Sequence, residues 1–438
     1  MNKSLYIVAF SLAFATTGIA QNNEGQDKTV DLGTQTTTEL RKTQAVSTIY
    51  SDELDKNATT SPYNAIYGLL PGLTVMQNTS WGTDKSRLNV RGRGSLNGDT
   101  PLFVVDGFAR PIEYINLSEI ESISVLKDGA ATALWGGRGA NGVVLITTKR
   151  GIYSQKDIKV DYKFGLGFPV NQPEFADAYT YAKARNEALR YDGLQPDMDE
   201  ASFLSGGNSD LYPNVDWQKE ALRNHTTSHQ LDITFRGGGK RLRYFSVLNY
   251  KNDMGLLNSK YTDYTDRYNS QMKKYFLNLR MNLDVDITDA TKLKLSMLGM
   301  LRETKRPTTS EATLFEQIFN TPSAAFPVQT LNGFWGSNNV LKTNPIANLA
   351  DVGYYKLNQR MLQADLRLVQ DLSVLTRGLS AELAIAYDNN ATYQETAKKS
   401  FMYQTIEKGT DGEPIYTNYG NPNDELEISN KGLANQYI

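Results

Sequence analysis

The sequence predicts a membrane β-barrel preceded by a compact α+β domain. Three observations predict this fold: an export signal at the N-terminus, short punctuated elements over residues 61–151, and a long series of alternating strands after residue 151. We expect about seven antiparallel strands, which would be part of a larger barrel and leave it incomplete, because open sheet edges cannot lie in lipid.

The composition limits the class of protein. Of the 438 residues, 40% are hydrophobic, which excludes wholesale disorder. The 46 Lys and Arg residues balance 48 Asp and Glu residues, so charge gives no reason to expect a nucleic-acid partner. With no Cys and two His, disulfides and thiolate metal sites are excluded. No pairing of nucleophile with base stands out either. We therefore predict no catalytic residue, no metal and no cofactor, and not an enzyme.

The first residues indicate secretion. Lys3 is followed by the apolar run Leu5 to Phe14 and by the small-residue cleavage site Gly18-Ile19-Ala20, so residues 1–20 are predicted to be a removed signal peptide. A buried N-terminal helix or strand is the alternative. The run is too short for a spanning helix, which needs about 20 residues. No longer apolar window follows, so any membrane crossing must use strands.

Residues 61–151 predict the α+β domain. A helical stretch opens at Pro62 and stops at Pro71-Gly72, and Asp106-Gly107 marks a tight hairpin turn. Ser118 to Glu121 has the pattern of a capping box, and Asp128 is placed to cap a short helix over 129–135. The expected strands lie at 73–76, 88–92, 102–105, 122–127 and 143–148, and the polar segment before this domain has a β-prone patch at 45–50.

From residue 152 apolar and polar residues alternate, as in strands between lipid and a wet lumen. The expected strands lie at about 158–166, 230–236, 241–251, 275–287, 293–301, 362–368 and 381–387. Long connections (168–225, 253–270, 303–359 and 389 to the end) alternate with short ones (237–240, 288–290 and 376–378). This alternation is typical of outer-membrane barrels rather than Greek-key sandwiches. The final residues, 435–438, are expected to form no strand.

Four motifs in the α+β segment carry a family resemblance: Val90 to Leu96, Pro101 to Gly107, Ile120 to Asp128, and Gly137 to Gly151. In this order they resemble the plug domain of SusC/RagA-type TonB-dependent outer-membrane transporters, and the likeness covers roughly residues 29–256. The residues that carry it are Arg91, Gly92, Arg93, Gly94, Asp106, Gly107, Lys127, Asp128, Gly136, Arg138, Gly139, Asn141 and Gly142.

The chain departs from this family in three respects. It has Trp135-Gly136-Gly137 where members often have Tyr-Gly-Ser or Tyr-Gly-Val. The segment before the plug leaves no room for the small β-domain that many members carry. The family resembles 22-stranded barrels, which need more strands than this chain supplies. The sequence is therefore expected to be an N-terminal fragment, a truncated gene or an incomplete record.

The resemblance implies a domain plan: signal peptide 1–20, periplasmic segment 21–42, plug 43–151 and partial barrel 152–438. It implies a TonB box, which joins the energy-transducing protein TonB by strand addition, although a plain linker is the alternative. The candidate box residues are Val30, Asp31, Leu32, Gly33, Thr34 and Gln35.

The same resemblance implies an importer in the lipid of the outer membrane. It would take up oligosaccharides, or peptides as in some relatives, with a SusD-like surface lipoprotein that contacts loops 168–225 and 303–359. One alternative is a secreted soluble protein that binds glycans or adheres. Another is a TonB-linked signalling receptor, which would need an N-terminal domain for which residues 21–40 leave no room.

Three further patterns have competing interpretations. Residues 137–142 match G-x-G-x-x-G but follow a helix and open a strand, so a tight turn is favoured over a nucleotide site. His225 and His229 lie about 13 Å apart if the segment is a strand, so a shared metal is disfavoured. The cluster formed by Arg87, Arg91 and Arg93 is expected to pair with carboxylates of the barrel wall.

Loop aromatics are the candidate ligand contacts. Trp217, Phe334 and Trp335 lie in the long connections, and their rings could stack on sugar faces. Packing within the loops, or anchoring at the membrane interface, is the alternative interpretation for all three.

Overall fold

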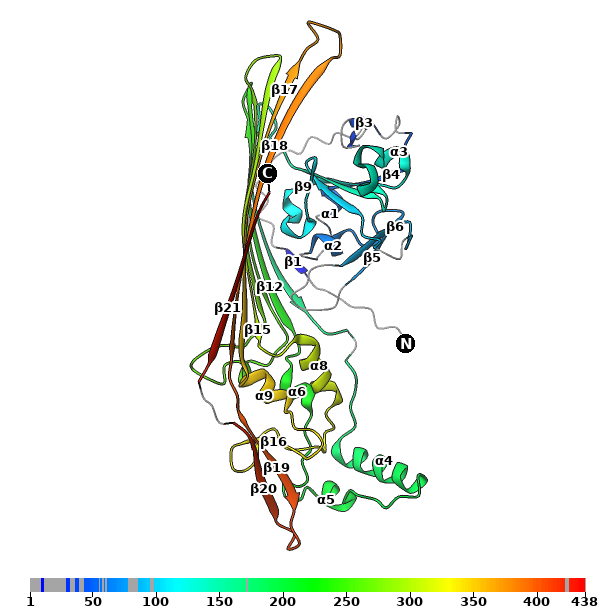
Figure 1. The fold of residues 1–438 in the computed structure, drawn as a ribbon, viewed down its shortest axis with the longest axis vertical. Helices are drawn as coiled ribbons and strands as arrows, with labels where there is room; N and C mark the ends of the chain where they lie inside the picture. The colour runs from blue at the N-terminus through cyan, green and yellow to red at the C-terminus, as the bar shows by residue number, and fades with distance from the viewer. Residues whose placement is uncertain are drawn as a thin grey trace.

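The computed structural model describes residues 9–11, 29–31, 36–38, 43–54, 56, 59, 61–77, 86–94, 98–170, 172–421 and 425–437. An α+β domain lies against one face of a tall, curved sheet, and the loop segments gather beyond one end of that sheet (Figure 1). Among the described residues, no helix is long and apolar enough to cross a membrane.

A five-stranded mixed sheet forms the centre of the α+β domain, in the order β4-β9-β10-β7-β8. Its core includes Ile49, Leu88, Ile120, Ile123 and Ile146. The strands are β4 (Val46–Tyr50), β7 (Leu102–Val105), β8 (Phe108–Ala109), β9 (Ile120–Leu126) and β10 (Val143–Thr148), with the separate pair β5 (Leu73–Met76) and β6 (Arg87–Val90). The helices are α1 (Ser51–Leu54), α2 (Pro62–Ala65), α3 (Gly129–Thr132), η1 (Ile112–Tyr114), η2 (Leu117–Glu119) and η3 (Ala133–Gly139).

Local signals in this domain are confirmed with two corrections. The Asp106-Gly107 turn joins β7 to β8, and both residues have positive φ, as a two-residue hairpin requires. The helix that begins at Pro62 ends earlier than predicted, at Ala65, because the chain turns and Gly68 adopts φ +73°. The capping box lies two residues before the predicted one: it joins Asn116 to Glu119 at η2.

The large sheet is antiparallel, and after β1 its strands follow chain order: β1-β11-β12-β13-β14-β15-β17-β18-β21. The long strands are β11 (Lys156–Gly167), β12 (Thr226–Gly238), β13 (Leu242–Met254), β14 (Lys273–Asp286), β15 (Thr291–Pro307), β17 (Gly353–Asp371), β18 (Ser380–Lys398) and β21 (Glu427–Tyr437). All seven predicted strands are present. β1 (Ala9–Ser11), from the predicted signal peptide, pairs with β11, and the cleavage site at 18–20 lies outside the described residues.

An eighth long strand corrects the prediction that the chain ends in a loop. β21 pairs with β18 from Lys398↔Glu427 to Asp388↔Tyr437. Its large apolar residues, Ile428, Leu433 and Tyr437, occur at both even and odd positions, so no alternation identifies the strand in the sequence. The predicted alternation of long and short connections is confirmed, with short turns at 239–241, 287–290 and 372–379.

The sheet exposes its apolar face and buries its polar face. On β14, the side chain of Met281 is 44% exposed, whereas that of the neighbouring Arg280 is 2% exposed. The same alternation places Leu277 and Leu279 outward, and Asn278 and Asn282 inward under the α+β domain. A soluble sandwich would bury the apolar face instead. The arrangement is that of a barrel wall with lipid outside and polar groups inside, so the soluble alternative is wrong.

The long connections pack into a module with its own apolar core, which includes Trp217, Leu257, Ile318, Phe326 and Trp335. Its elements are α4 (Ala178–Tyr191), α5 (Glu200–Ser205), α6 (Trp217–Ala221), α7 (Ser259–Thr262), α8 (Glu311–Asn320), α9 (Pro345–Ala350), β16 (Trp335–Ser337), β19 (Met402–Lys408) and β20 (Pro414–Gly420). The remaining described strands, β2 (Thr29–Asp31) and β3 (Thr36–Thr38), pair with each other.

We predict that Met281→Arg prevents stable insertion into a bilayer. The residue lies near the middle of the apolar stretch of β14, where an arginine facing lipid costs about 2–4 kcal/mol. Heat-modifiable migration of the membrane fraction measures the inserted form. Leu331→Arg, at an exposed position in the loop module, is the control and should leave it unchanged. Equal insertion of the two variants would contradict a lipid-facing β14.

Candidate functional site

The candidate site is the contact surface between the α+β domain and the polar face of the large sheet, which we call the seam. The segments of the α+β domain that follow β8 or flank η2 and β10 contact side chains of β12, β14, β15, β17 and β18. Asn249 of β13 joins this contact through Asp232 of β12. The domain supplies both cations and anions to the seam, and the sheet supplies their partners.

Arg110 makes the most extensive charged contact of the seam. It directly follows β8, and its buried guanidinium lies between Asp365 of β17 and Asp388 of β18. Nη1 and Nη2 donate to the two oxygens of Asp365 at 2.7 and 2.5 Å, while Nε and Nη2 donate to Asp388 at 2.9 and 2.5 Å. Burial alone would lower the pKa of Arg110, but these two carboxylates raise it above its ordinary value. The group therefore stays charged.

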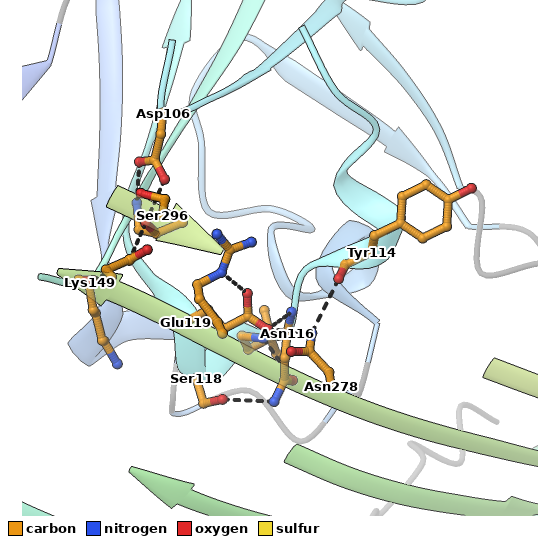
Figure 2. Close-up of polar contacts among 12 residues, drawn as sticks. Asp106, Tyr114, Asn116, Ser118, Glu119, Lys149, Asn278 and Ser296 are labelled. Atoms are coloured by element: carbon orange, nitrogen blue, oxygen red, sulfur yellow. Dashed lines mark hydrogen bonds and ion pairs between the residues drawn. The ribbon is translucent and has the colours of Figure 1, made fainter. Parts of the chain in front are cut away.

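Glu119 is the fully buried anion of the α+β domain at the seam. One of its oxygens accepts from Nδ2 of Asn278 at 2.6 Å, and the other accepts from Nε of Arg280 at 2.5 Å. The same carboxylate accepts from the backbone N–H of Asn116, so the capping box that shapes η2 also orients it. Figure 2 shows Asn116 and Glu119 turned toward Asn278 on the sheet.

Two further contacts extend this region along the sheet. The side-chain amide of Asn116 donates to Asp232 of β12 at 3.0 Å, and Asp232 also accepts from Gln230 at 2.6 Å and from Asn249. Nη2 of Arg302 on β15 donates to the backbone carbonyl of Glu113 at 2.5 Å. Each buried charge of these contacts has a partner across or along the sheet, as burial requires.

The segment after β10 joins the sheet in the same way. Arg150 donates to Asp284 of β14 at 2.9 Å and to the hydroxyl of Ser296 of β15 at 2.9 Å. Asn282 of β14 donates to the hydroxyl of Thr148 at 2.9 Å and to the backbone carbonyl of Lys149 at 2.7 Å. This attachment lies directly before β11, where the chain enters the large sheet.

The seam has a small apolar part and an incomplete set of hydrogen bonds. Tyr114 packs with Leu298, Met300 and Met361 in one buried cluster. Several buried polar atoms of the seam have no hydrogen-bond partner among the described residues: Oδ1 of Asn249, Asn278 and Asn282, and Nη2 of Arg280. Such atoms reduce the net stability of an interface. The domain is therefore held by a few strong charged contacts rather than by a continuous apolar core.

Most of the residues that carry the resemblance stabilise the α+β domain itself. Asp106 accepts from the backbone N–H and the hydroxyl of Thr148 at 3.0 and 2.6 Å. Lys127 donates to Ser47 at 2.5 Å, and Asp128 caps α3 as predicted, accepting from the backbone N–H of Ala131 at 2.7 Å. Backbone donors lower the pKa of Asp128, with Ala45 as the largest contributor.

The glycine-rich turn at 136–142 is a packing feature. Gly142 has φ +89°, and a Cβ there would approach the side chain of Val90 to 2.8 Å, so the backbone needs glycine. Gly136 has φ +53° at the kink in η3, and Gly139 is buried. Asn141 donates to the carbonyl of Gly98 at 3.1 Å, whereas Arg138 is exposed. This packing favours a tight turn over a nucleotide site.

The structure corrects the expected role of the arginine cluster. Arg87 donates to Asp99 at 2.9 and 2.7 Å, and Arg93 lies 3.7 Å from the same carboxylate, all within the α+β domain. Arg91 is exposed, with φ +58° next to Gly92, and exposed Gly94 follows Arg93. Contacts with wall carboxylates do occur, but Arg110 and Arg150 make them.

The loop aromatics also require a correction. Trp217 and Trp335 are 3% and 4% exposed, in the core of the loop module, and their indole N–H groups donate to the carbonyl of Pro322 and to Asp351. Little of either ring is open to a ligand, and Phe334, next to Trp335 in the chain, is half-buried. His229 contacts Tyr162 through a 2.7 Å hydrogen bond, and His225 lies beside Phe168. Within the described residues, no group of three or more potential metal ligands occurs.

Only part of the candidate TonB box lies within the described residues. Val30 and Asp31 belong to β2, and Val30 is fully buried in a cluster with Val46, Val104 and Val143 of the α+β domain. Leu32, Gly33, Thr34 and Gln35 lie outside the described residues. The described end of the candidate box is thus packed directly on the domain.

Comparisons with known proteins agree with this architecture. A family model described as the TonB-dependent receptor plug domain matches residues 38–143. The TonB-dependent receptor SusC of Bacteroides thetaiotaomicron is 29% identical over 283 residues, which cover 61% of this chain and 26% of SusC. TonB-dependent receptor P26 of Formosa agariphila is 27% identical over 281 residues, which cover 62% of this chain and 26% of that receptor. The chain thus spans about a quarter of the length of these relatives.

A solved structure shares the fold. The RagAB peptide importer in its closed-closed state superposes with a TM-score of 0.65 over 81% of this chain and 42% of the importer chain, at 18% identity. At that identity the likeness shows the fold alone.

We predict that Arg110→Ala loosens the seam by about 3–5 kcal/mol, because Asp365 and Asp388 lose their shared cation in a buried site. Hydrogen exchange of β7 and β10 amides should accelerate at least about 100-fold if those amides exchange through seam opening. Arg87→Ala, which removes a half-exposed arginine paired within the domain, is the control and should leave the exchange nearly unchanged. Equal exchange rates in the two variants would show that Arg110 does not hold the seam.

Proposed function

We propose that this chain, which belongs to the SusC/RagA type of TonB-dependent outer-membrane receptors, takes part in energised import across the outer membrane. The α+β domain is the plug. When TonB pulls the N-terminal segment, the plug is partly displaced from the sheet and a path opens. This role needs binding and movement but no catalytic residue and no cofactor.

The observation that carries this proposal is the composition of the seam. A domain meant to stay in place permanently would be expected to share a large apolar core with the sheet. Here the charged contacts of Arg110, Glu119 and Arg150 dominate, and several polar atoms have no partner in the part of the chain that the structure describes. Such groups can exchange their partners for water when the domain moves, so displacement exposes surface that water solvates well.

The substrate and the surface partner are proposed from the relatives. RagAB is described as a peptide importer, and SusC is a related receptor. We propose oligosaccharides or peptides as the substrate class and a SusD-like surface lipoprotein as the partner. Loops 168–225 and 303–359 build most of the loop module and lie beyond the sheet end opposite the short turns, which suits contact with an external partner (Figure 1).

We propose that residues 30–35 form the TonB box. The burial of Val30 against Val46 and Val143 supports this assignment, because a pull on β2 would act directly on the plug core. The partner would add a strand through backbone hydrogen bonds. The main chain, rather than a particular side chain, would therefore determine binding.

Binding to TonB is expected to depend on backbone donors in this segment. A pull-down with the C-terminal domain of TonB should lose the interaction when residues 29–35 are deleted. Leu32→Pro should weaken binding strongly, because proline removes a ladder donor, whereas Leu32→Thr keeps the donor and should bind nearly as well. The assignment fails if the deletion binds TonB as well as the intact chain.

Import is expected to require movement at the seam. Since the chain has no Cys, Glu121→Cys with Arg236→Cys creates one specific pair, at side chains 3.4 Å apart across the seam. A cross-linker that joins these two cysteines and that reductant can cleave should stop the uptake of labelled oligosaccharide or peptide mixtures by cells. Adding reductant should restore the uptake. The pair Arg87→Cys with Asp99→Cys, linked within the plug, is the control and should permit uptake. Full uptake by the seam-linked protein would refute displacement of the plug.

A further inference from the structure

On strands β13 to β18, the outward face of the large sheet carries charge at one end only. On the described strands β13 to β18, alternation places apolar or uncharged residues at nearly every outward position. The charged exceptions all lie near the end of the strands that joins the loop module: Lys273, Glu303, Lys305, Lys356, Arg360 and Glu395. The opposite end of these strands, at the short turns, has no charged outward residue.

Three of these cations form a row across neighbouring strands. Lys273 of β14 is the register partner of Lys305 on β15, and Lys305 is the register partner of Lys356 on β17. Neighbouring strands lie about 4.8 Å apart, so the three Cα atoms fall within about 10 Å. Like charges directly opposite each other destabilise a sheet. The row therefore has a cost to the fold that an external anion would remove.

Glu303 holds two of the ammonium groups close together. Its carboxylate lies 3.2 Å from Nζ of Lys305 and 3.2 Å from Nζ of Lys356. Glu395, the register partner of Lys356, accepts a hydrogen bond from the hydroxyl of Tyr354 at 2.7 Å. Four cations face two carboxylates in this patch, so its net charge stays positive and suits an anion.

The height of the row matches a membrane interface. The next outward position toward the turns holds Tyr275, whose register partner is Glu303. One further step reaches the pair Leu277 and Leu301, where the apolar band begins. Tyrosine at the edge of an apolar band marks the interface of a membrane barrel. The lysine row lies just beyond the tyrosine, at headgroup level, on the side of the external loops.

We propose that Lys273, Lys305 and Lys356 bind the phosphate groups of an anionic glycolipid in the outer leaflet of the membrane. Basic clusters next to an apolar surface recognise such headgroups through charge, while the acyl chains lie on the apolar band. Arg360, on the same face opposite Leu301, extends the cationic surface toward the band. The lipid fixes the height of this wall segment in the membrane, independently of the contacts inside the barrel.

The test uses the purified chain in neutral detergent micelles, with fluorescent diphosphoryl lipid A as the probe. Lys273→Gln, Lys305→Gln and Lys356→Gln combined should weaken binding about 100-fold, at roughly fivefold for each lysine. The matched control replaces three exposed lysines of loops and turns, Lys183, Lys240 and Lys342, by Gln and should bind as the parent does. Equal weakening in both triple variants would overturn the proposal.

Two additional measurements identify the ligand and guard against misfolding. Glu303→Gln removes the competing carboxylate and should tighten binding several-fold, so an unchanged or weaker affinity would count against the site. Inorganic phosphate at 10-fold excess over the lipid should displace little probe, because it lacks acyl chains for the apolar band. Complete displacement would indicate a site for free phosphate and would refute a lipid site.

Discussion

The polar face of the large sheet lies against the plug, and the placement of the other parts follows from this contact. A sheet that exposes Met281 and Leu279 to lipid must direct Arg280 and Asn278 to its other face, because side chains alternate along a strand. Charged groups there need partners, and the plug supplies them through Glu119 and Arg110. The plug thus supplies polar partners to a sheet whose apolar face points outward and whose polar face is buried, which is the reverse of a soluble protein.

Ion pairs give this contact an unusual balance of strength and reversibility. Removing one member of a buried pair is costly, yet separating both members into water returns much of the energy that burial took from them. An apolar interface has no such compensation, because every exposed apolar area adds to the cost of opening. A seam built on Arg110, Glu119 and Arg150 therefore resists random loosening and still permits a directed displacement.

Local patterns predicted most of the fold, and long-range contacts explain what they could not predict. Asp106-Gly107 and Asp128 determine a turn and a cap from a few neighbouring residues, so the sequence was sufficient for them. β21 is held by its pairing with β18 and has no alternation of its own, so it was missed. The seam residues follow the same rule. Nothing near Arg110 in the sequence indicates Asp365 or Asp388, which lie more than 250 residues away. The clustered Arg87 and Arg93, in contrast, pair with the nearby Asp99.

The two faces of the wall carry separate tasks because of strand alternation. On β15, Ser296, Met300 and Arg302 face the plug, while Leu301, Glu303 and Lys305 face outward, so neighbouring residues of one strand contact different surroundings. A change at an outward lysine leaves the register and the inward hydrogen bonds in place. The proposed anchoring of the wall in the outer leaflet can therefore be tuned without altering the seam, and the proposed displacement of the plug does not require the wall to move. This separation is what a stationary frame with a movable plug requires.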